Sequence, residues 1–355
     1  MTDTTTTMST IRKKSFLGSL MARFYGNNFL LIITIVLFAG MYITGSVIFS
    51  NKNFGTLNSF FDMLNSNSAL IVLAAGMTMV LISGGIDISV GAQMAMYCMM
   101  FAYFIEKQHV NAYTMIVVVL ITGVVFGLIQ GVLVAYFDIQ PFIVTLAGLF
   151  LARGLTAMIS PETISIQDPN FQSLVSMKLR FPFGGYYNSV GDYQQPFVYL
   201  HVVLALLILI ALYVMMTWTK FGRSIYAVGG NQQSARLMGL NVRRTKLMVY
   251  VLNGFLAAFA GFLFCLFSPA GAVEKAPAYE MYAIAAAVIG GAMFTGGVGN
   301  VLGSLFGVLV QATIIKFVNF TGTLSNGWPE FIRAAIMSFF IILQAVFTWV
   351  RKQRE

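Results

Sequence analysis

The stretch Lys220–Lys246, KFGRSIYAVGGNQQSARLMGLNVRRTK, is the longest strongly polar run between two long apolar segments of this chain. It carries six Lys or Arg residues and no Asp or Glu. A positive charge bias in a short loop between membrane spans is typical of the cytoplasmic side. The stretch therefore predicts a cytoplasmic loop, and it sets the orientation of the apolar segments on either side of it.

The centre of this loop, Gly230–Gly239, has the pattern of a short helix. Asn231 is the candidate N-cap, and Gly239 is the candidate terminator. A short helix presented to the cytosol, with little reactive chemistry of its own, suggests docking to another protein. We therefore expect a coupling segment for a cytosolic partner, formed by Gly230, Asn231, Ser234, Ala235, Arg236 and Gly239.

Composition places the chain among integral membrane proteins. It is 58% hydrophobic and 9% charged over 355 residues, whereas a soluble domain carries roughly 25% charged residues. The net charge of +9 does not predict a nucleic-acid partner, because the positive residues are arranged by membrane side rather than on one basic face. The lipid bilayer is thus the expected environment.

Hydropathy predicts an all-α polytopic protein with about ten transmembrane helices of roughly 17–25 residues each. The expected spans are approximately Phe29–Phe49, Ser68–Ser83, Val90–Ile105, Asn111–Phe137, Pro141–Ser160, Phe197–Met216, Leu247–Phe267, Tyr282–Phe294, Val301–Val318 and Phe331–Val350. The first span is too long for the apolar core of a signal peptide. The second and eighth are short, and both run into glycine clusters. Ten spans place the N- and C-termini together on the cytoplasmic side.

The charged residues agree with this orientation of a single membrane domain over residues 29–350. Residues 1–28 form a polar and basic cytoplasmic tail, residues 217–246 the cytoplasmic loop, and residues 351–355 a basic cytoplasmic tail. Acidic residues show the opposite bias. The acids assigned to the outer side are Asp62, Glu106, Glu162, Asp168, Asp192, Glu274, Glu280 and Glu330.

The long outer segment, residues 161–196, is rich in Pro, Gly, Tyr and Phe. One interpretation is a loosely structured connector. The other is a structured cap that meets a soluble partner or shields the outer opening. The aromatic residues favour the cap, because such side chains are common at protein interfaces.

The run Ile82–Gly91, ISGGIDISVG, interrupts the second and third spans. Adjacent glycines expose backbone groups, which membrane depth tolerates only beside protein or a water-filled cavity. Asp87 is the acid embedded in this break, and a carboxylate at a helix centre costs roughly 2.5–3.5 kcal/mol on the insertion scale. We favour Asp87 or Ser89 as N-cap of the third helix. Direct contact with a substrate or a gate is the alternative.

A second glycine cluster, Ile289–Gly299, interrupts the eighth and ninth spans. Its spacing does not fit a dinucleotide-binding fingerprint. Two sets of glycines recur every four residues and predict smooth faces for close helix packing. These sets are Gly123, Gly127 and Gly131, and Gly299, Gly303 and Gly307.

Other polar residues within the spans carry weaker signals. For Arg153 and Arg333, pairing with a carboxylate and reaching toward a lipid headgroup are both open interpretations, and the sequence does not identify the partner. The sequence contains no Gly-Lys-Ser/Thr phosphate loop, so we expect ATP to be bound by another protein. Cys98 and Cys265 both lie inside apolar spans, which is typical of small core residues, and the two histidines are isolated. We therefore expect no catalytic site, no cofactor and no metal centre in this chain.

Three stretches together resemble a known family. SGGIDISVG, FGRSIYAVGGNQQSARLMGLNVRRTK and GGAMFTGGVGNVLGSLFGVLVQ are similar to the ribose/xylose/galactose class of ATP-binding-cassette import permeases, over about residues 60–345. PFIVTLAGLFLARGLTAMIS and VNFTGTLS are most similar to the galactofuranose-type branch of that class.

The resemblance implies a multi-pass permease of the bacterial inner membrane that translocates a monosaccharide. It also implies three kinds of partner: cytosolic ATPase subunits that grip the coupling segment, a second permease subunit that is identical or paralogous, and a periplasmic or lipid-anchored sugar-binding protein. Closure of the ATPase subunits would push on the coupling segment, and the two glycine breaks would bend to open the path. The expected gating residues are Gly84, Gly85, Asp87, Ser89, Gly91, Gly290, Gly291, Gly296 and Gly297.

Two other classes of transporter remain as alternatives. An ion-coupled secondary transporter needs acids or histidines inside the membrane, and Asp87 is the acid that qualifies. A passive channel needs a ring or filter of polar groups, and no such pattern stands out in the sequence. The ATP-driven permease is the interpretation that the sequence favours.

Overall fold

The computed structural model describes residues 29–187, 192–322 and 327–352 of the chain. Its helices are α2 (Phe29–Ile48), the 3-10 turn η1 (Ser50–Lys52), α3 (Leu57–Ile82), α4 (Val90–Glu106), α5 (Ala112–Ala135), α6 (Pro141–Ile159), α7 (Pro169–Ser176), α8 (Leu200–Trp218), α9 (Lys220–Gly230), α10 (Gln232–Leu237), α11 (Val242–Phe267), α12 (Tyr279–Ile289), α13 (Val301–Thr321) and α14 (Trp328–Lys352). Its strands are β1 (Ile164–Ser165), β2 (Lys178–Arg180), β3 (Tyr186–Tyr187), β4 (Tyr193–Gln194), β5 (Phe197–Tyr199) and β6 (Ala270–Gly271).

The protein is a polytopic bundle of apolar helices, as the composition predicts. Seven helices of the described chain are long and apolar enough to cross a membrane: α2, α3, α5, α6, α8, α11 and α13. Each matches one of the expected spans. The other three expected spans correspond to the 17 residues of α4, the 11 residues of α12 and the 25 residues of α14.

Several boundaries differ from the prediction, and two of them are instructive. Helix α3 begins at Leu57, well before the expected Ser68, because the side chain of Thr56 accepts a hydrogen bond from the N–H of Ser59 and caps the helix there. Helix α12 ends at Ile289, although the prediction continued to Phe294. The glycines that follow Ile289 form a loop, so the apolar letters of this stretch do not extend the helix.

Helix α11 forms the centre of the bundle with α3, α4 and α5, against which it packs. The three glycines of α5 lie on this contact: a Cβ at Gly123 or Gly127 would clash with the backbone of α11, and one at Gly131 would lie 2.9 Å from the carbonyl oxygen of Leu247. Burial separates central from peripheral helices. Most of the apolar window of α3 is buried (89%), against 11% for α2.

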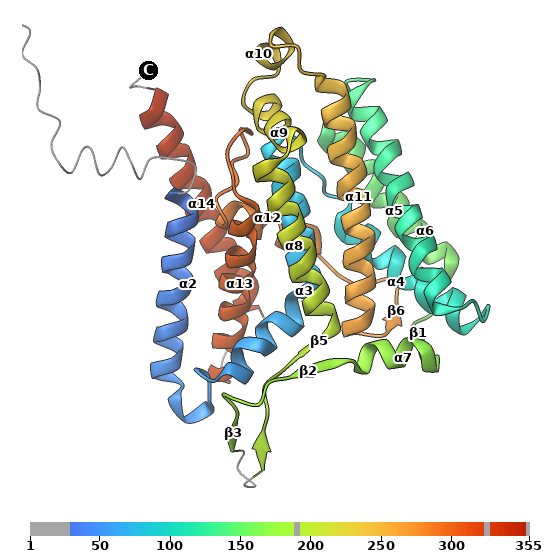
Figure 1. The fold of residues 1–355 in the computed structure, drawn as a ribbon, viewed down its shortest axis with the longest axis vertical. Coiled ribbons are helices and arrows are strands. Elements are labelled where there is room, and N and C mark those ends of the chain that lie inside the picture. Colours follow the sequence, from blue (N-terminus) through green and yellow to red (C-terminus); the bar gives the residue numbers. More distant parts are fainter. Residues whose placement is uncertain (1–28, 188–191, 323–326, 353–355) are drawn as a thin grey trace, which may run out of the picture.

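The two ends of the bundle carry different structures. Figure 1 shows α10 at one end, and α7 with the short strands at the opposite end. Strand β1 pairs with β6, β2 with β5, and β3 with β4, all antiparallel. Asp168 caps α7 by accepting from the N–H of Phe171 at 2.9 Å. The described part of residues 161–196 is therefore a folded cap, and the loosely structured connector is the wrong interpretation for it.

Candidate functional site

Three backbone segments meet near the α10 end of the bundle. They are the end of α3, the end of α9 and the loop between α12 and α13. The N–H of Gly297 in that loop donates to the carbonyl oxygen of Ile82 at 2.8 Å. A Cβ at Gly229 of α9 would clash with that same carbonyl oxygen and would lie 2.8 Å from the nitrogen of Gly297. The absence of a side chain at Gly229 lets the three segments touch through their backbones.

Helix α9 also contacts other residues of the second glycine break. Gly297 has a φ of +74°, and a Cβ there would lie 2.6 Å from the Cα of Gly230. A Cβ at Gly296 would lie 2.6 Å from the carbonyl oxygen of Gly229. The hydroxyl of Tyr226 donates to the carbonyl oxygen of Gly299 at 2.9 Å. Helix α9 therefore contacts both breaks, and a shift of α9 must move or strain both.

The coupling segment has the local structure that the sequence predicts. The side chain of Asn231 accepts from the N–H of Ser234 at 2.9 Å at the start of α10. Gly239 ends the turn with a φ of +80°, and its N–H donates to the carbonyl oxygen of Arg236 at 2.9 Å. Ala235 is buried and packs with Val228, Leu240 and Val242, which anchors the turn to α9 and α11.

Two features of this region were not predicted from the sequence: helix α9, and the exposure of two apolar residues in the turn. Leu237 is 84% exposed and Met238 is 68% exposed, at the far end of the molecule. Large apolar side chains are costly to leave in water and mark interaction surfaces when they lie together. The pattern that would have identified Leu237 and Met238 is a pair of adjacent large apolar residues within a polar loop.

Asp87 is fully buried in the first break and is held by three hydrogen bonds. Its Oδ1 accepts from the backbone N–H of Ser89 at 2.9 Å and from the Ser89 hydroxyl at 2.5 Å. Its Oδ2 accepts from the side-chain amide of Asn253, near the middle of α11, at 2.7 Å. A buried carboxylate is tolerated when donors of this kind replace water.

A chain of polar side chains extends from this carboxylate. The amides of Gln93 and Gln130 both donate to the Ser89 hydroxyl oxygen at 2.8 Å. The hydroxyl of Tyr97 donates to the side-chain carbonyl of Gln93 at 3.1 Å. These side chains come from α4 and α5, and Asn253 comes from α11. The network therefore fastens the first break to the centre of the bundle.

The predicted N-cap of α4 holds for position but not for side-chain chemistry. Ser89 stands at the N-cap position of α4, but its side chain makes no capping hydrogen bond. Its hydroxyl donates to Asp87, which in turn accepts from the N–H of Ser89 itself rather than from the first turn of the helix. Gly84 has a φ of +79°, and a Cβ at Gly85 would lie 2.7 Å from the hydroxyl of Tyr250. The break is thus ordered by long-range contacts.

The structure also corrects the position of Glu280, which the sequence analysis assigned to the outer side. Glu280 is in the first turn of α12, and a Cβ at Gly91, in the first turn of α4, would clash with its Oε2. That oxygen is buried and has no hydrogen-bond partner within the described residues. The carboxylate of Glu280 is therefore a second acid within the bundle, in addition to that of Asp87.

Arg153 explains how α12 begins inside the bundle. Its guanidinium donates to the carbonyl oxygens of Val273 at 2.9 Å, Lys275 at 2.8 Å and Ala276 at 3.2 Å. Arg153 therefore holds the chain that enters α12, where Ala276 and Ala278 have φ values of +52° and +58°. The sequence left its partner open between a carboxylate and a headgroup, and the carboxylate of Glu280 does interact electrostatically with Arg153. Its hydrogen-bond acceptors, however, are backbone carbonyls, which the sequence did not indicate.

The remaining predicted glycines pack helices against one another. A Cβ at Gly303 would clash with the carbonyl of Gly290, and one at Gly307 with the carbonyl of Ala286. Gly291 lies against Leu30 of α2, where a Cβ would be 2.7 Å from the Leu30 side chain. Gly299 precedes α13 and lies in the loop, so it does not belong to the helical face expected for it.

Comparison with known proteins supports a role in transport. Residues 59–345 match the family described as branched-chain amino acid transport system / permease component. The inner membrane ABC transporter permease protein YjfF of Escherichia coli (strain K12) is 37% identical over 294 residues, which cover 83% of this chain and 86% of the relative.

Two further relatives are import permeases for sugars by name. The fructose import permease protein FruG of Bifidobacterium longum (strain NCC 2705) is 33% identical, over 87% of this chain and 88% of the relative. The ribose import permease protein RbsC of Escherichia coli (strain K12) is 31% identical, over 82% of this chain and 87% of the relative. No solved structure matches the chain. The family consists of transport components rather than enzymes, and this chain belongs to it: it is a multi-pass membrane protein of the branched-chain amino acid transport system / permease component family.

Proposed function

We propose that this chain is the membrane-spanning permease subunit of an ATP-binding-cassette importer that carries a monosaccharide across the bacterial inner membrane. The observation that carries the mechanism is the contact of α9 with Ile82 and Gly297, which links a cytosolic segment to both glycine breaks. The sugar is supported by the names of the relatives FruG and RbsC. The family description itself names branched-chain amino acids. A test of the transported substrate must therefore include a branched-chain amino acid.

The proposed topology has ten spans in one domain over residues 29–350, with both termini in the cytosol. In Figure 1 the first turn of α2 and the last turn of α14 lie toward the same end of the bundle as α10. Helices α4, α12 and α14 raise the seven long apolar helices to ten. Helices α4 and α12 are shorter, and each continues from a glycine break or a held loop rather than spanning alone.

In the proposed cycle, an ATPase subunit grips α10 through the exposed side chains of Leu237 and Met238. ATP is bound by that subunit and not by this chain. Closure of the ATPase pushes on the turn that Asn231 and Ala235 anchor to α9. Because α9 contacts both breaks, the push bends the α3–α4 and α12–α13 segments and opens the path to the cytosol.

Two further partners complete the proposed assembly. A second permease subunit, identical or paralogous, would form the other wall of the path. A periplasmic or lipid-anchored sugar-binding protein would dock on the folded cap of residues 161–196. The exposed side chains of Leu179 and Phe183 in this cap provide apolar contact area for such a partner.

Affinity purification from native membranes in mild detergent, followed by reconstitution of the recovered complex in liposomes, tests this proposal. We expect an ATPase subunit to co-purify and uptake of labelled D-galactose, D-ribose or D-fructose to require ATP, with L-leucine as the amino-acid comparison. Uptake that an ion gradient drives without ATP would contradict the proposal and favour coupling through Asp87 or Glu280. ATP-driven uptake of L-leucine alone would contradict the sugar assignment.

A further inference from the structure

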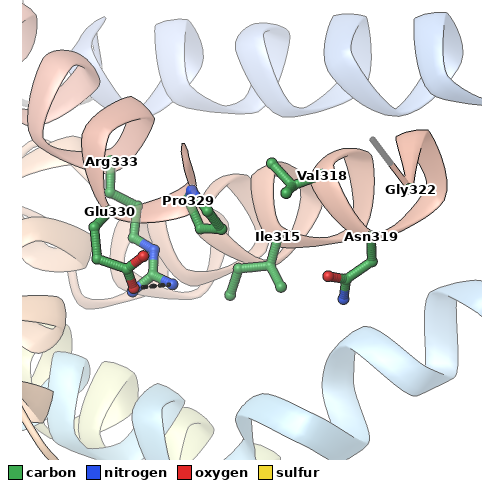
Figure 2. Close-up of a pocket in the computed structure, with 7 residues that line it drawn as sticks. All are labelled: Ile315, Val318, Asn319, Gly322, Pro329, Glu330 and Arg333. Carbon is green, nitrogen blue, oxygen red and sulfur yellow. Dashed lines mark ion pairs between the residues drawn. The ribbon is translucent and has the colours of Figure 1, made fainter. Parts of the chain in front are cut away.

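A cavity of about 330 Å³ lies between α13 and α14 at the outer end of the bundle (Figure 2). Three polar side chains, Asn319, Glu330 and Arg333, line it together with the apolar Ile315 and Val318. The outer position follows from a neighbouring contact. Lys52 of η1, in the turn after α2, donates to the carbonyl oxygen of Phe320 beside this cavity.

Arg333 is the best-held side chain of this cavity, and it keeps one donor unused. Its side chain is 11% exposed, and its guanidinium lies 4.1 Å from the centroid of the Tyr282 ring. A terminal nitrogen is 3.5 Å from Oε1 of Glu330. The Nε atom is buried without a hydrogen-bond partner in the described part of the chain. A buried donor without a partner calls for a functional explanation, such as a ligand.

The other polar groups are arranged around that guanidinium. The hydroxyl of Tyr282 donates to Oε1 of Glu330 at 3.3 Å. The amide of Gln311 donates to the carbonyl oxygen of Tyr282 at 3.0 Å and fixes α12 against α13. Glu330 is 54% exposed, and Figure 2 shows its carboxylate beside Arg333. The wall formed by Arg333 is therefore held against Tyr282, and the wall formed by Glu330 is accessible to a molecule from outside.

The charge of the cavity indicates the class of ligand. Arg333 and Glu330 form an ion pair, so their charges balance and no excess charge selects an anion or a cation. A guanidinium that donates, a carboxylate that accepts and the Asn319 amide that does both match a ligand with several neighbouring hydroxyl groups. The volume lies at the lower end of the range for small-molecule pockets, which suits one sugar ring.

We propose that this cavity is an entry subsite at which the transported monosaccharide first binds the permease. The inference rests on the proposed function, and it adds a place and a set of residues to it. Tyr282, which supports Arg333, lies in α12, and α12 leads directly into the second glycine break. A sugar that binds Arg333 therefore contacts a side chain that stacks on α12, the helix whose inner end adjoins the gate.

Fluorescence of Trp328 provides a direct binding test, because this residue begins α14 next to Pro329, which lines the cavity. The permease is purified in nanodiscs with Trp218→Phe and Trp349→Phe, which leaves Trp328 as the one tryptophan of the three in the sequence. D-galactose, D-ribose and D-fructose are titrated in turn. We expect at least one to give a saturable change whose half-saturating concentration does not depend on salt, because the ligand is neutral.

Variants connect that signal to the cavity. Arg333→Gln and Glu330→Gln are expected to raise the half-saturating concentration at least about tenfold, since each removes a hydrogen bond to a charged group. Asn319→Ala changes an exposed residue of α13, so we expect this variant to fold as the wild type does. It should raise the half-saturating concentration of the sugar severalfold. Glu162→Gln, an exposed outer acid away from the cavity, is the control. No saturable change with any of the three sugars, or wild-type binding by Asn319→Ala and Arg333→Gln, would overturn the subsite.

Uptake by the reconstituted importer separates this inference from the proposed function. If both hold, the cavity variants raise the KM for the sugar and leave its uptake dependent on ATP. A wild-type KM in every cavity variant, with uptake still driven by ATP, would overturn the subsite alone. A wild-type complex without ATP-dependent uptake would overturn the proposed function.

Discussion

The two glycine breaks are ordered by different kinds of contact. In the first, residues 83–89, the carboxylate of Asp87 and the hydroxyl of Ser89 bind side chains from α4, α5 and α11. In the second, residues 290–300, backbone groups dominate: Gly296 donates to Met293, and Gly297 donates to Ile82. The first break is therefore fastened by side chains, and the second by close backbone packing. Loss of a polar group should loosen the first, whereas an added Cβ should disrupt the second.

The junction that the two breaks share should be the most sensitive position. Gly229→Ala places a methyl group against the carbonyl oxygen of Ile82, which belongs to the backbone and cannot move aside. We expect a loss of stability of about 3 kcal/mol or more, as for severe overpacking, measured as thermal unfolding of the purified permease. Gly230→Ala is the matched control, because the nearest atom to its Cβ is 4.0 Å away. Equal stability of the two variants would contradict the junction.

The side-chain network of the first break should give the next largest effect. Asp87→Asn keeps the shape but turns one acceptor into a donor that faces Ser89 or Asn253. We expect a loss of roughly 1.5–3 kcal/mol, measured by thermal unfolding, with no change in which sugar is taken up. Asp138→Asn, an exposed acid between α5 and α6, is the control. A changed sugar preference would show that Asp87 contacts the substrate.

The backbone packing of the second break predicts a comparable but smaller effect of an added Cβ. Gly297→Ala must adopt a φ of +74° and approach Gly230, and a left-handed conformation costs an L-residue about 1–2 kcal/mol. Gly154→Ala is the control, because its Cβ would meet nothing within 4 Å and alanine favours the helix of α6. Thermal unfolding of the two variants side by side measures the difference. A destabilising Gly154→Ala would remove the basis of the comparison.

The smallest effect is expected at Tyr226, a side chain that ties α9 to the second break. Tyr226→Phe removes the hydroxyl that donates to the carbonyl oxygen of Gly299 and keeps the ring. We expect a loss of about 1 kcal/mol and a reduced number of sugar molecules transported per ATP hydrolysed. Tyr136→Phe, at an exposed residue directly after α5, provides a matched substitution. A wild-type transport ratio in Tyr226→Phe would show that this contact does not transmit motion.

Local chemistry made much of this structure predictable from the sequence. The apolar runs give the membrane helices, and the side chain of Asn231 and the flexibility of Gly239 define the ends of α10. Even the glycines of α5 were identifiable, because a repeat of four residues places them on one helical face. In each of these cases the signal lies within a few consecutive residues.

The junction and the corrected residues depend on contacts between distant segments. Gly229 meets Ile82 and Gly297 through backbone atoms, which carry no sequence signature of their own. Arg153 binds three backbone carbonyls for the same reason, so a search for a partner acid could not find them. The sequence placed Glu280 on the outer side because it gives no sign that α12 begins inside the bundle. The hydrogen bonds of Arg153 to the chain that enters α12 hold it there.

The central claim is that an ATPase acts on both breaks through α10 and α9, and the exposed tip of α10 tests it most directly. Leu237→Asp with Met238→Asp changes only exposed residues, so stability should stay within about 0.5 kcal/mol of the wild type. Phe137→Asp, also exposed and in the loop between α5 and α6, is the control. The measurement is ATP-dependent sugar uptake by the reconstituted complex. The account predicts that the double variant loses uptake while it remains folded and inserted; uptake at the wild-type rate would contradict it.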